Sequence, residues 1–332
     1  MISVEHLTKC YGDFTAVNDL SFEIGEGHVY GFLGPNGAGK STTMNIMTGC
    51  LSATEGHVKI DGYDIFEEPE KAKKLIGYLP ELPPLYMTET PEEYLRFVGE
   101  AKGLRGKELA QQIEDVIRQT KIEDVRNRRI SALSKGYKQR VGIAQAILGN
   151  PRVIILDEPT VGLDPIQIIE IRALIKELGQ NHTVIFSSHI LSEVQTICDQ
   201  ILIIARGKLL AFGTPESLEQ QLLESNEITI TAEAGEEEVR EILAGVNRIT
   251  GIRVEKKENG LLEAHLQTDH KNIYEVSGAV FSAFAAKGKV LLEMAVKKAN
   301  LEDIFIELTE HKEEAEISAK PGKTSEKEEA EQ

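Results

Sequence analysis

The sequence predicts an α/β protein with a mostly parallel core sheet covered by helices, followed by a small α+β domain. Its 332 residues exceed what one compact core usually holds, so we expect about two domains. From Met1 to about Phe212, short aliphatic runs alternate with helical patterns, which is typical of parallel strands that helices bury on both faces. The pattern breaks at Gly213, Thr214 and Pro215 and resumes with a different periodicity.

The first region contains four runs whose nearly continuous hydrophobicity indicates buried strands. These are His28–Leu33, Val153–Leu156, Thr183–Ser187 and Ile201–Ala205. Two helices are marked by their ends as well as by their apolar faces. Thr90 and Glu93 provide a capping box around the first-turn Pro91. A second helix is expected to begin at Asp164 and to end at Gly179.

The region after Pro215 has the pattern of a small α+β domain, preceded by a helical connector at Glu216–Glu224. We expect a strand at Glu227–Thr231, a helix at Glu237–Leu243, a hairpin of Ile252–Lys257 and Leu261–Gln267 around Asn259 and Gly260, a helix at Asn272–Lys287, a strand at Val290–Val296 and a helix at Leu301–Leu308. This order resembles a ferredoxin-like domain. We therefore place one domain at residues 1–215 and another at 226–310. Residues 311–332 are almost free of large apolar side chains, so we expect a disordered charged tail.

The composition narrows the classes of partner. A formal net charge of -17 repels phosphate backbones and anionic lipid at long range, so we expect no nucleic-acid partner. The three cysteines lack zinc-binding spacing, and the N-terminal residues lack the apolar core of a signal peptide, so we expect a cytoplasmic protein. The longest aliphatic stretches are far shorter than the ~20 residues that span a bilayer. Any role at a membrane is therefore expected to come through another chain.

A glycine-rich loop provides the first chemical motif. The segment Gly34–Ser41 fits GxxxxGK[ST] and lies between a predicted strand and a helical stretch, where a phosphate-binding P-loop needs to be. In such a loop, backbone N–H groups surround phosphate oxygens, the lysine adds positive charge and the serine hydroxyl is a magnesium ligand. The predicted nucleotide contacts here are Gly34, Pro35, Asn36, Gly37, Ala38, Gly39, Lys40, Ser41 and Thr42. A chance glycine-rich turn is the alternative, and the position between strand and helix disfavours it.

Two adjacent acids, Asp157 and Glu158, follow the apolar run Val153–Leu156. Parallel strands present their carboxyl ends at the edge where α/β sheets bind ligands. Asp157 is therefore predicted to hold magnesium, and Glu158 to orient or deprotonate the attacking water. Two acids that merely begin a surface turn are the alternative, which the neighbouring P-loop makes less favourable.

A third element, Leu133–Tyr137, lies just upstream of the paired acids, and Gly162–Asp164 and His189 follow them. The order of P-loop, serine-glycine element, paired acids, glycine-aspartate turn and strand-end histidine resembles the ATP-binding cassette (ABC) ATPases. The resemblance covers about Met1 to Phe212. It implies a P-loop NTPase fold of ABC type with a helical subdomain, and ATP and Mg²⁺ as ligands.

The resemblance also implies roles for individual residues. Tyr11 matches the aromatic residue that stacks on adenine, with Val17 as its apolar neighbour. Glu158 and His189 match the catalytic carboxylate and the switch histidine. The implied metal ligands are Ser41, Glu81 and Asp157. Ser134, Gly136 and Asp164 match residues that act in trans, on ATP held by the opposite subunit, so a homodimer is implied.

Three positions depart from the common family pattern. Glu81 stands where glutamine is usual, Lys135 replaces a glycine of the serine-glycine element, and Tyr137 replaces its glutamine. Similar replacements are found in cassettes paired with ABC-2 type exporters. The chain as a whole resembles that subgroup, and its N-terminal sequence is similar to the gliding-motility-associated cassette subunits.

The resemblance implies the ATP-hydrolysing subunit of a membrane transporter. Two copies would close around two MgATP molecules and pull on separate transmembrane permease subunits, which would hold the chain at the inner face of the cell membrane. The alternative is a mechanochemical ABC ATPase without a membrane partner, acting in DNA repair or on ribosomes. Against it, no sustained heptads separate Lys40 from Ser134, and the chain has one P-loop. A module that binds ATP without hydrolysing it is disfavoured by the intact Lys40, Asp157, Glu158 and His189.

Overall fold

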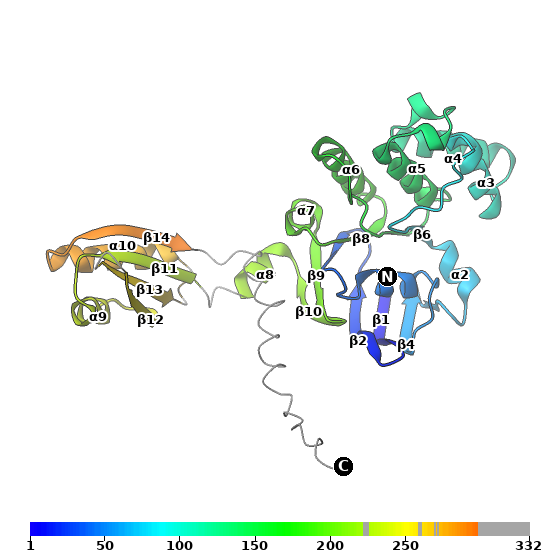
Figure 1. The fold of residues 1–332 in the computed structure, drawn as a ribbon. Helices are drawn as coiled ribbons and strands as arrows, with labels where there is room; N and C mark the ends of the chain where they lie inside the picture. Colours follow the sequence, from blue (N-terminus) through cyan, green and yellow to red (C-terminus); the bar gives the residue numbers. More distant parts are fainter. Residues whose placement is uncertain (222–225, 258–260, 269, 271, 298–332) are drawn as a thin grey trace, which may run out of the picture.

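The computed structural model describes residues 1–221, 226–257, 261–268, 270 and 272–297. Three sheets account for the strands in this part of the chain. Two of them belong to the N-terminal α/β unit, and the third forms the C-terminal unit (Figure 1).

The core of the N-terminal unit is a six-stranded sheet in the order β10-β9-β3-β8-β7-β6. Its strands are β3 (Val29–Leu33), β6 (Ile76–Leu79), β7 (Val153–Leu156), β8 (Thr183–Ser188), β9 (Gln200–Ala205) and β10 (Lys208–Gly213). All neighbouring pairs are parallel except β9 and β10. The mostly parallel sheet predicted from the sequence is confirmed, and the four predicted strands correspond to β3, β7, β8 and β9.

Both faces of this sheet are covered, which explains the continuous hydrophobicity of its strands. In β7, Ile154 and Leu156 pack into one apolar cluster, whereas Val153 and Ile155 pack into another. The first cluster contains side chains of α5 (Lys135–Ile147), α6 (Pro165–Leu178) and α7 (Leu191–Ile197). The second contains side chains of α1 (Lys40–Met47) and of an antiparallel sheet.

The antiparallel sheet has the order β2-β1-β4-β5. Its strands are β1 (Ile2–Tyr11), β2 (Phe14–Ile24), β4 (Glu55–Ile60) and β5 (Tyr63–Asp64). The sequence patterns did not predict these strands. The β1/β2 pairing shifts register between Val4 and Leu7, between Leu7 and Lys9, and between Lys9 and Cys10, which interrupts simple alternation.

Several helices lie between β5 and β7 in the sequence: α2 (Pro69–Lys74), α3 (Pro91–Ala101), α4 (Gly106–Gln119), the 3₁₀ helices η1 (Glu123–Val125) and η2 (Ile130–Ala132), and α5. Figure 1 shows α3, α4 and α5 grouped together beyond the edge strand β6, whereas α2 contacts β5 and β6. The predicted capping box at the start of α3 is confirmed, because Thr90 and Glu93 exchange hydrogen bonds. Asp164 caps α6, as predicted, and α8 (Pro215–Gln221) follows β10.

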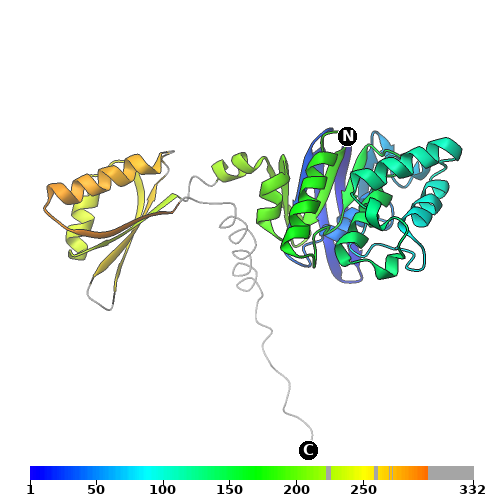
Figure 2. The ribbon, with the colours of Figure 1, turned by 90° about the horizontal axis from the view of Figure 1, so that it is seen from above.

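The C-terminal unit contains β11 (Asn226–Ala232), α9 (Glu236–Ala244), β12 (Ile249–Lys256), β13 (Leu262–Thr268), α10 (Ile273–Ala286) and β14 (Leu291–Lys297). Its antiparallel sheet has the order β12-β13-β11-β14, and α9 and α10 share its separate apolar core (Figure 2). This βαββαβ order matches the predicted succession of elements. Three of the predicted features lie outside the described residues: the turn at Asn259 and Gly260, the helix at Leu301–Leu308 and the tail at 311–332. The limits of the two domains, residues 1–215 and residues 226–310, stay predictions.

Candidate active site

The glycine-rich loop connects β3 to α1 and is shaped by close backbone contacts. Gly39 caps α1 with a φ of 102°, and a Cβ there would lie 2.6 Å from the carbonyl oxygen of Ala16. A Cβ on Gly34 would lie 2.3 Å from the carbonyl oxygen of Ile204. Neither glycine therefore tolerates a side chain. No side chain bonds to the N-terminal amides of α1, so its first turn is open to an anion.

Lys40, the first residue of α1, is buried, with 6% of its surface exposed. Its ammonium donates to the carbonyl oxygens of Gly34 at 2.8 Å and Pro35 at 3.3 Å. The same ammonium lies 3.4 Å from Oε1 of Glu158. The positive charge of Lys40 is therefore held by two carbonyl groups of the loop and by one buried acid.

Asp157 and Glu158 follow β7 directly, as the sequence predicts. Asp157 is only 2% exposed, and its Oδ1 accepts hydrogen bonds from the hydroxyls of Ser41 at 3.1 Å and Ser187 at 2.6 Å. Ser187 in turn accepts the backbone N–H of Glu158 at 2.7 Å. Sequence analysis missed Ser187. The sequence feature that could have indicated Ser187 was a hydroxyl near the end of the strand next to β7, since a side chain there reaches the same edge of the sheet.

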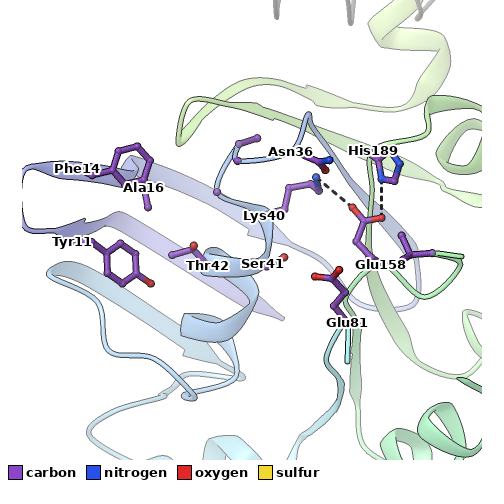
Figure 3. Close-up of a pocket in the computed structure, with 14 residues that line it drawn as sticks. Tyr11, Phe14, Ala16, Asn36, Lys40, Ser41, Thr42, Glu81, Glu158 and His189 are labelled. Atoms are coloured by element: carbon purple, nitrogen blue, oxygen red, sulfur yellow. Dashed lines mark hydrogen bonds and ion pairs between the residues drawn. The ribbon is translucent and has the colours of Figure 1, made fainter. Parts of the chain in front are cut away.

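Glu158 has a left-handed backbone, with φ at 46°. For a residue with a Cβ this conformation costs about 1–3 kcal/mol and persists where surrounding contacts hold it. Here the contacts are on both carboxylate oxygens, since Lys40 lies beside Oε1 and Nδ1 of His189 is 3.0 Å from Oε2 (Figure 3). The predicted catalytic pair, Glu158 and His189, is therefore in direct contact.

These groups lie in a pocket of about 560 Å³. It is lined by Tyr11, Phe14, Ala16, Asn36, Gly37, Ala38, Gly39, Lys40, Ser41, Thr42, Glu81, Glu158, Val161 and His189. Tyr11 and Phe14 lie at one end, and Glu158 and His189 at the other (Figure 3). Glu81 follows β6 and faces Ser41 and Glu158 across the pocket. The pocket thus joins an aromatic end, the glycine-rich loop and an end that contains Glu158 and His189.

Two aromatic-end residues differ from the sequence prediction. Val17 is fully buried in the core and does not line the pocket, whereas its neighbour Ala16 does. Phe14 was missed; it pairs with Tyr11 across the β1/β2 hairpin, and both rings are at least half exposed. The sequence feature that could have indicated Phe14 was the two-residue Gly-Asp turn between the aromatic residues.

Three other predicted site residues are not among those that line the pocket: Gly34, Pro35 and Asp157.

The residues predicted to act in trans lie outside this pocket's lining. Ser134 caps α5, and its hydroxyl accepts the N–H of Tyr137 at 3.4 Å. Gly136 packs against Gln167, where a Cβ would lie 2.5 Å from the side-chain carbon of the amide. Asp164 accepts the N–H of Gln167 at 3.0 Å. The serine-glycine element and the glycine-aspartate turn are therefore neighbours within one chain.

Comparison with known proteins identifies the family. The sequence pattern of the ABC transporter family matches residues 17–161. The linearmycin resistance ATP-binding protein LnrL of Bacillus subtilis is 33% identical over 310 residues, which cover 93% of this chain and 98% of that protein. The bacitracin transport ATP-binding protein BcrA of Bacillus licheniformis is 39% identical over 212 residues, covering 63% of this chain and 68% of that protein.

Among solved structures, the dimeric post-hydrolysis state of the ATP-binding cassette MJ0796 bound to ADP and Pi is similar. Its TM-score is 0.59 at 27% identity, over 64% of this chain and 98% of that one. The predicted ABC-type P-loop fold and ATPase activity are confirmed by these likenesses. The protein binds and hydrolyses ATP to drive transport. The chain belongs to the ATP-binding proteins of ABC transporters.

Proposed function

We propose that this chain is the MgATP-hydrolysing subunit of an ABC-2 type exporter, similar to the gliding-motility-associated cassettes. The observation that carries the proposal is the contact of Lys40 and His189 with the two oxygens of one buried acid, Glu158, beside the open N-terminus of α1. The departures at Glu81, Lys135 and Tyr137 support the exporter subgroup. So do the resistance and transport functions named for LnrL and BcrA.

The nucleotide would lie along the pocket with its base at the aromatic end. Tyr11 would stack on adenine, with Phe14 and Ala16 as neighbours. The glycine-rich loop and the first turn of α1 would receive the phosphates. Lys40 would then exchange its contact with Glu158 for a phosphate oxygen, because the terminal phosphate carries more negative charge than a single carboxylate.

Glu158 would orient or deprotonate the attacking water once Lys40 has turned to the phosphate. The left-handed backbone of Glu158 and the hydrogen bond that its N–H donates to Ser187 fix where the carboxylate points. His189 lies beside Glu158 and 40% of its side chain is exposed, so it would reach the terminal phosphate while still contacting the acid. Binding, water activation and phosphate contact are thus divided among three adjacent side chains.

The oxygen atoms beside the phosphate loop fit magnesium. Ser41 Oγ and Asp157 Oδ1 are 3.1 Å apart, and Glu81, which follows β6, faces Ser41 (Figure 3). Carboxylate and hydroxyl oxygens are hard ligands, and Mg²⁺ characteristically takes one or two carboxylates together with substrate phosphates. When bound, Mg²⁺ would neutralise phosphate charge during transfer. Ser41, Asp157 and Glu81 are the residues that would hold it.

Two copies of the chain would form the working unit. Ser134, Gly136 and Asp164 do not line their own chain's pocket, and the N-terminus of α5 that begins at Ser134 is exposed. The homodimer would bring these residues to the terminal phosphate of ATP bound by the partner. MJ0796 in its ADP- and Pi-bound state is dimeric, which supports this arrangement.

A permease would dock near Glu81. Four apolar side chains are unusually exposed in this region: Leu82 at 84%, Tyr86 at 48%, Met87 at 44% and Phe97 at 50%. The rings of Tyr86 and Phe97 are 5.1 Å apart, so they form one aromatic surface. Exposed aromatic patches mark protein interfaces. Such a contact would hold the chain at the inner face of the cell membrane and connect the permease to the nucleotide through Glu81.

In the part of the chain that the structure describes, no helix is both long and apolar enough to cross a bilayer. The permease would therefore be a separate chain in our proposal. We propose that residues 226–310 form a domain distinct from the ATPase, because β11–β14 and their helices have an apolar core of their own.

Steady-state ATPase assays test the proposal. The parent chain should hydrolyse ATP with Mg²⁺ and not in EDTA, and Lys40→Met should lose most nucleotide affinity. Glu67→Gln, at an exposed acid outside the pocket, serves as the control and should match the parent. Phe97→Asp should keep basal hydrolysis but lose co-purification with a membrane protein. Hydrolysis in EDTA, or unchanged affinity in Lys40→Met, would refute the assigned site.

A further inference from the structure

A second buried carboxylate lies behind the active-site loops, and the proposed chemistry does not use it. Glu193, on α7, is 1% exposed. Its Oε2 accepts hydrogen bonds from the hydroxyls of Thr160 at 2.8 Å and Ser188 at 2.9 Å. Both hydroxyl residues are themselves buried, at 4% and 0% exposure. One carboxylate oxygen therefore joins two different loops.

These two loops carry the proposed catalytic pair. Thr160 is two residues after Glu158, and Ser188 directly precedes His189. Ser188 also accepts the N–H of Ile190 at 3.0 Å, which fixes the turn that follows the histidine. A shift of Glu193 would therefore move the acid and the histidine relative to each other, because its bonds are short and closed to water.

The other oxygen of Glu193 faces Arg172 on α6. The two are an ion pair, with Nη2 of Arg172 at 3.3 Å from Oε1. Among the described residues, Arg172 Nε and Glu193 Oε1 are the buried side-chain atoms that have no hydrogen-bond partner. Buried polar atoms are normally satisfied, so an unsatisfied charged pair is a costly feature that packing alone does not explain. A slight movement of α6 would let Arg172 Nε and Glu193 Oε1 form the hydrogen bond that each of them lacks.

The opposite side of α6 is tied to α5. Glu170, two residues from Arg172, accepts a charged hydrogen bond from Arg140 at 2.6 Å. Arg140 lies on the helix that begins at Ser134 and also donates to the carbonyl oxygen of Thr120 at 2.9 Å. A displacement of α5 would thus be passed through α6 to the Arg172 and Glu193 pair.

We propose that Glu193 is a positioning residue that holds the Glu158 and His189 loops in register, and that Arg172 sets its position according to the placement of α6. The inference rests on the proposed roles of Glu158 and His189. Glu193 contacts neither pocket nor nucleotide, so it governs the rate of hydrolysis and leaves ATP binding in the ground state unchanged.

Variants of the full chain test this inference. Glu193→Gln keeps the shape and an accepting oxygen but removes the charge that faces Arg172. Thr160→Val removes one hydroxyl of the clamp at constant volume. Because small misplacements of reacting groups cost up to about a hundredfold in rate, we expect each variant to lower kcat about tenfold or more. KM for ATP should change by less than about twofold, since ground-state binding is untouched.

The matched control is Thr196→Val on the same helix, whose hydroxyl bonds only to the carbonyl oxygen of Ser192. It should leave kcat unchanged. Combining Thr160→Val with Glu193→Gln should lower kcat less than the product of the single effects, because both substitutions weaken the same clamp between the two loops. A merely structural role would lower thermal stability without this split between kcat and KM.

Glu158→Gln measured in parallel distinguishes the positioning role of Glu193 from the catalytic roles of Glu158 and His189. If it hydrolyses ATP at the parent rate, the proposed catalytic roles fail. If it is inactive while Thr160→Val and Glu193→Gln turn over normally, only the positioning role is overturned. Should Glu193→Gln not fold, Thr160→Val decides alone: a parental kcat overturns the proposal, and a lowered kcat with parental KM supports it.

Discussion

Replacing Glu158 with glutamine should tighten ATP binding while stopping hydrolysis. The acid is 8% exposed and lies 3.4 Å from the ammonium of Lys40. In the proposed binding mode, ATP would draw Lys40 away from this acid before the lysine contacts a phosphate. Glutamine keeps the volume and an accepting oxygen but removes the charge, so Lys40 is released without that competition.

The size of the effect follows from the geometry. Two unit charges 3.4 Å apart attract by about 5 kcal/mol at an effective dielectric constant of 20. Most of this is offset, since the lysine keeps its two carbonyl acceptors and the lost pair was itself desolvated. A net gain of about 1.4 kcal/mol corresponds to roughly tenfold tighter ATP binding. Loss of a general base should lower kcat by at least about a hundredfold.

The assay combines equilibrium nucleotide binding, phosphate release and size-exclusion chromatography with MgATP. Glu158→Gln should bind more tightly, release phosphate slowly and elute as a trapped dimer. Glu67→Gln makes the same substitution at an exposed acid outside the pocket and should behave like the parent. Equal affinity together with a parental rate in Glu158→Gln would show that Glu158 neither restrains Lys40 nor activates water.

Three further substitutions probe other parts of the site and its supporting helix. Glu81→Gln should tighten metal-free ATP binding, because it removes a charge near the phosphates; an unchanged ratio of affinities in magnesium and in EDTA would exclude Glu81 from the site. Tyr11→Ala should weaken ATP binding by about tenfold through lost stacking, whereas Tyr11→Phe should not; equal titrations of both variants would count against an adenine contact. Thr90→Ala removes the N-cap of α3 and should cost about 1 kcal/mol of unfolding free energy, seen as a lower Tm. The Thr90 backbone N–H and, second, the Thr90 hydroxyl lower the pKa of Glu93; Thr90→Ala removes only the hydroxyl bond, whose contribution is present above pH 4.5 and is lost as the pH falls below it, so the stability difference should shrink towards pH 3, and a constant difference would count against that hydroxyl–carboxylate bond.

Local sequence patterns were sufficient to predict the parts of the candidate site that are continuous in the sequence. The glycine-rich loop occurs within eight residues, and the strand that delivers Asp157 and Glu158 is short and apolar from end to end. The capping box of α3 likewise needs only Thr90 and Glu93. The hydrogen bonds of the loop and of the capping box join near neighbours, so composition and spacing determine them, and the strand is marked by its apolar composition alone.

The aromatic end of the pocket depends on strand register instead. Alternation alone does not say whether Ala16 or Val17 faces the nucleotide, because the β1/β2 pairing shifts between Lys9 and Cys10. One such shift exchanges the buried and the pocket-facing side chain. The structure buries Val17 completely and leaves Ala16 in the lining, a result that requires the long-range pairing.

The polar network behind the site follows from the adjacency of β7 and β8. Leu156 and Phe186 are register partners, so the chain segments two residues beyond them bring Glu158 and Ser188 to the same sheet edge. These segments also carry Thr160 and His189, and α7 follows the histidine by a single residue. A carboxylate on the first turn of α7 then reaches hydroxyls from both loops. Sequence patterns show Glu193 as one acid in a short helix. The parallel strand order makes it the shared partner of the two loops that carry the proposed catalytic pair.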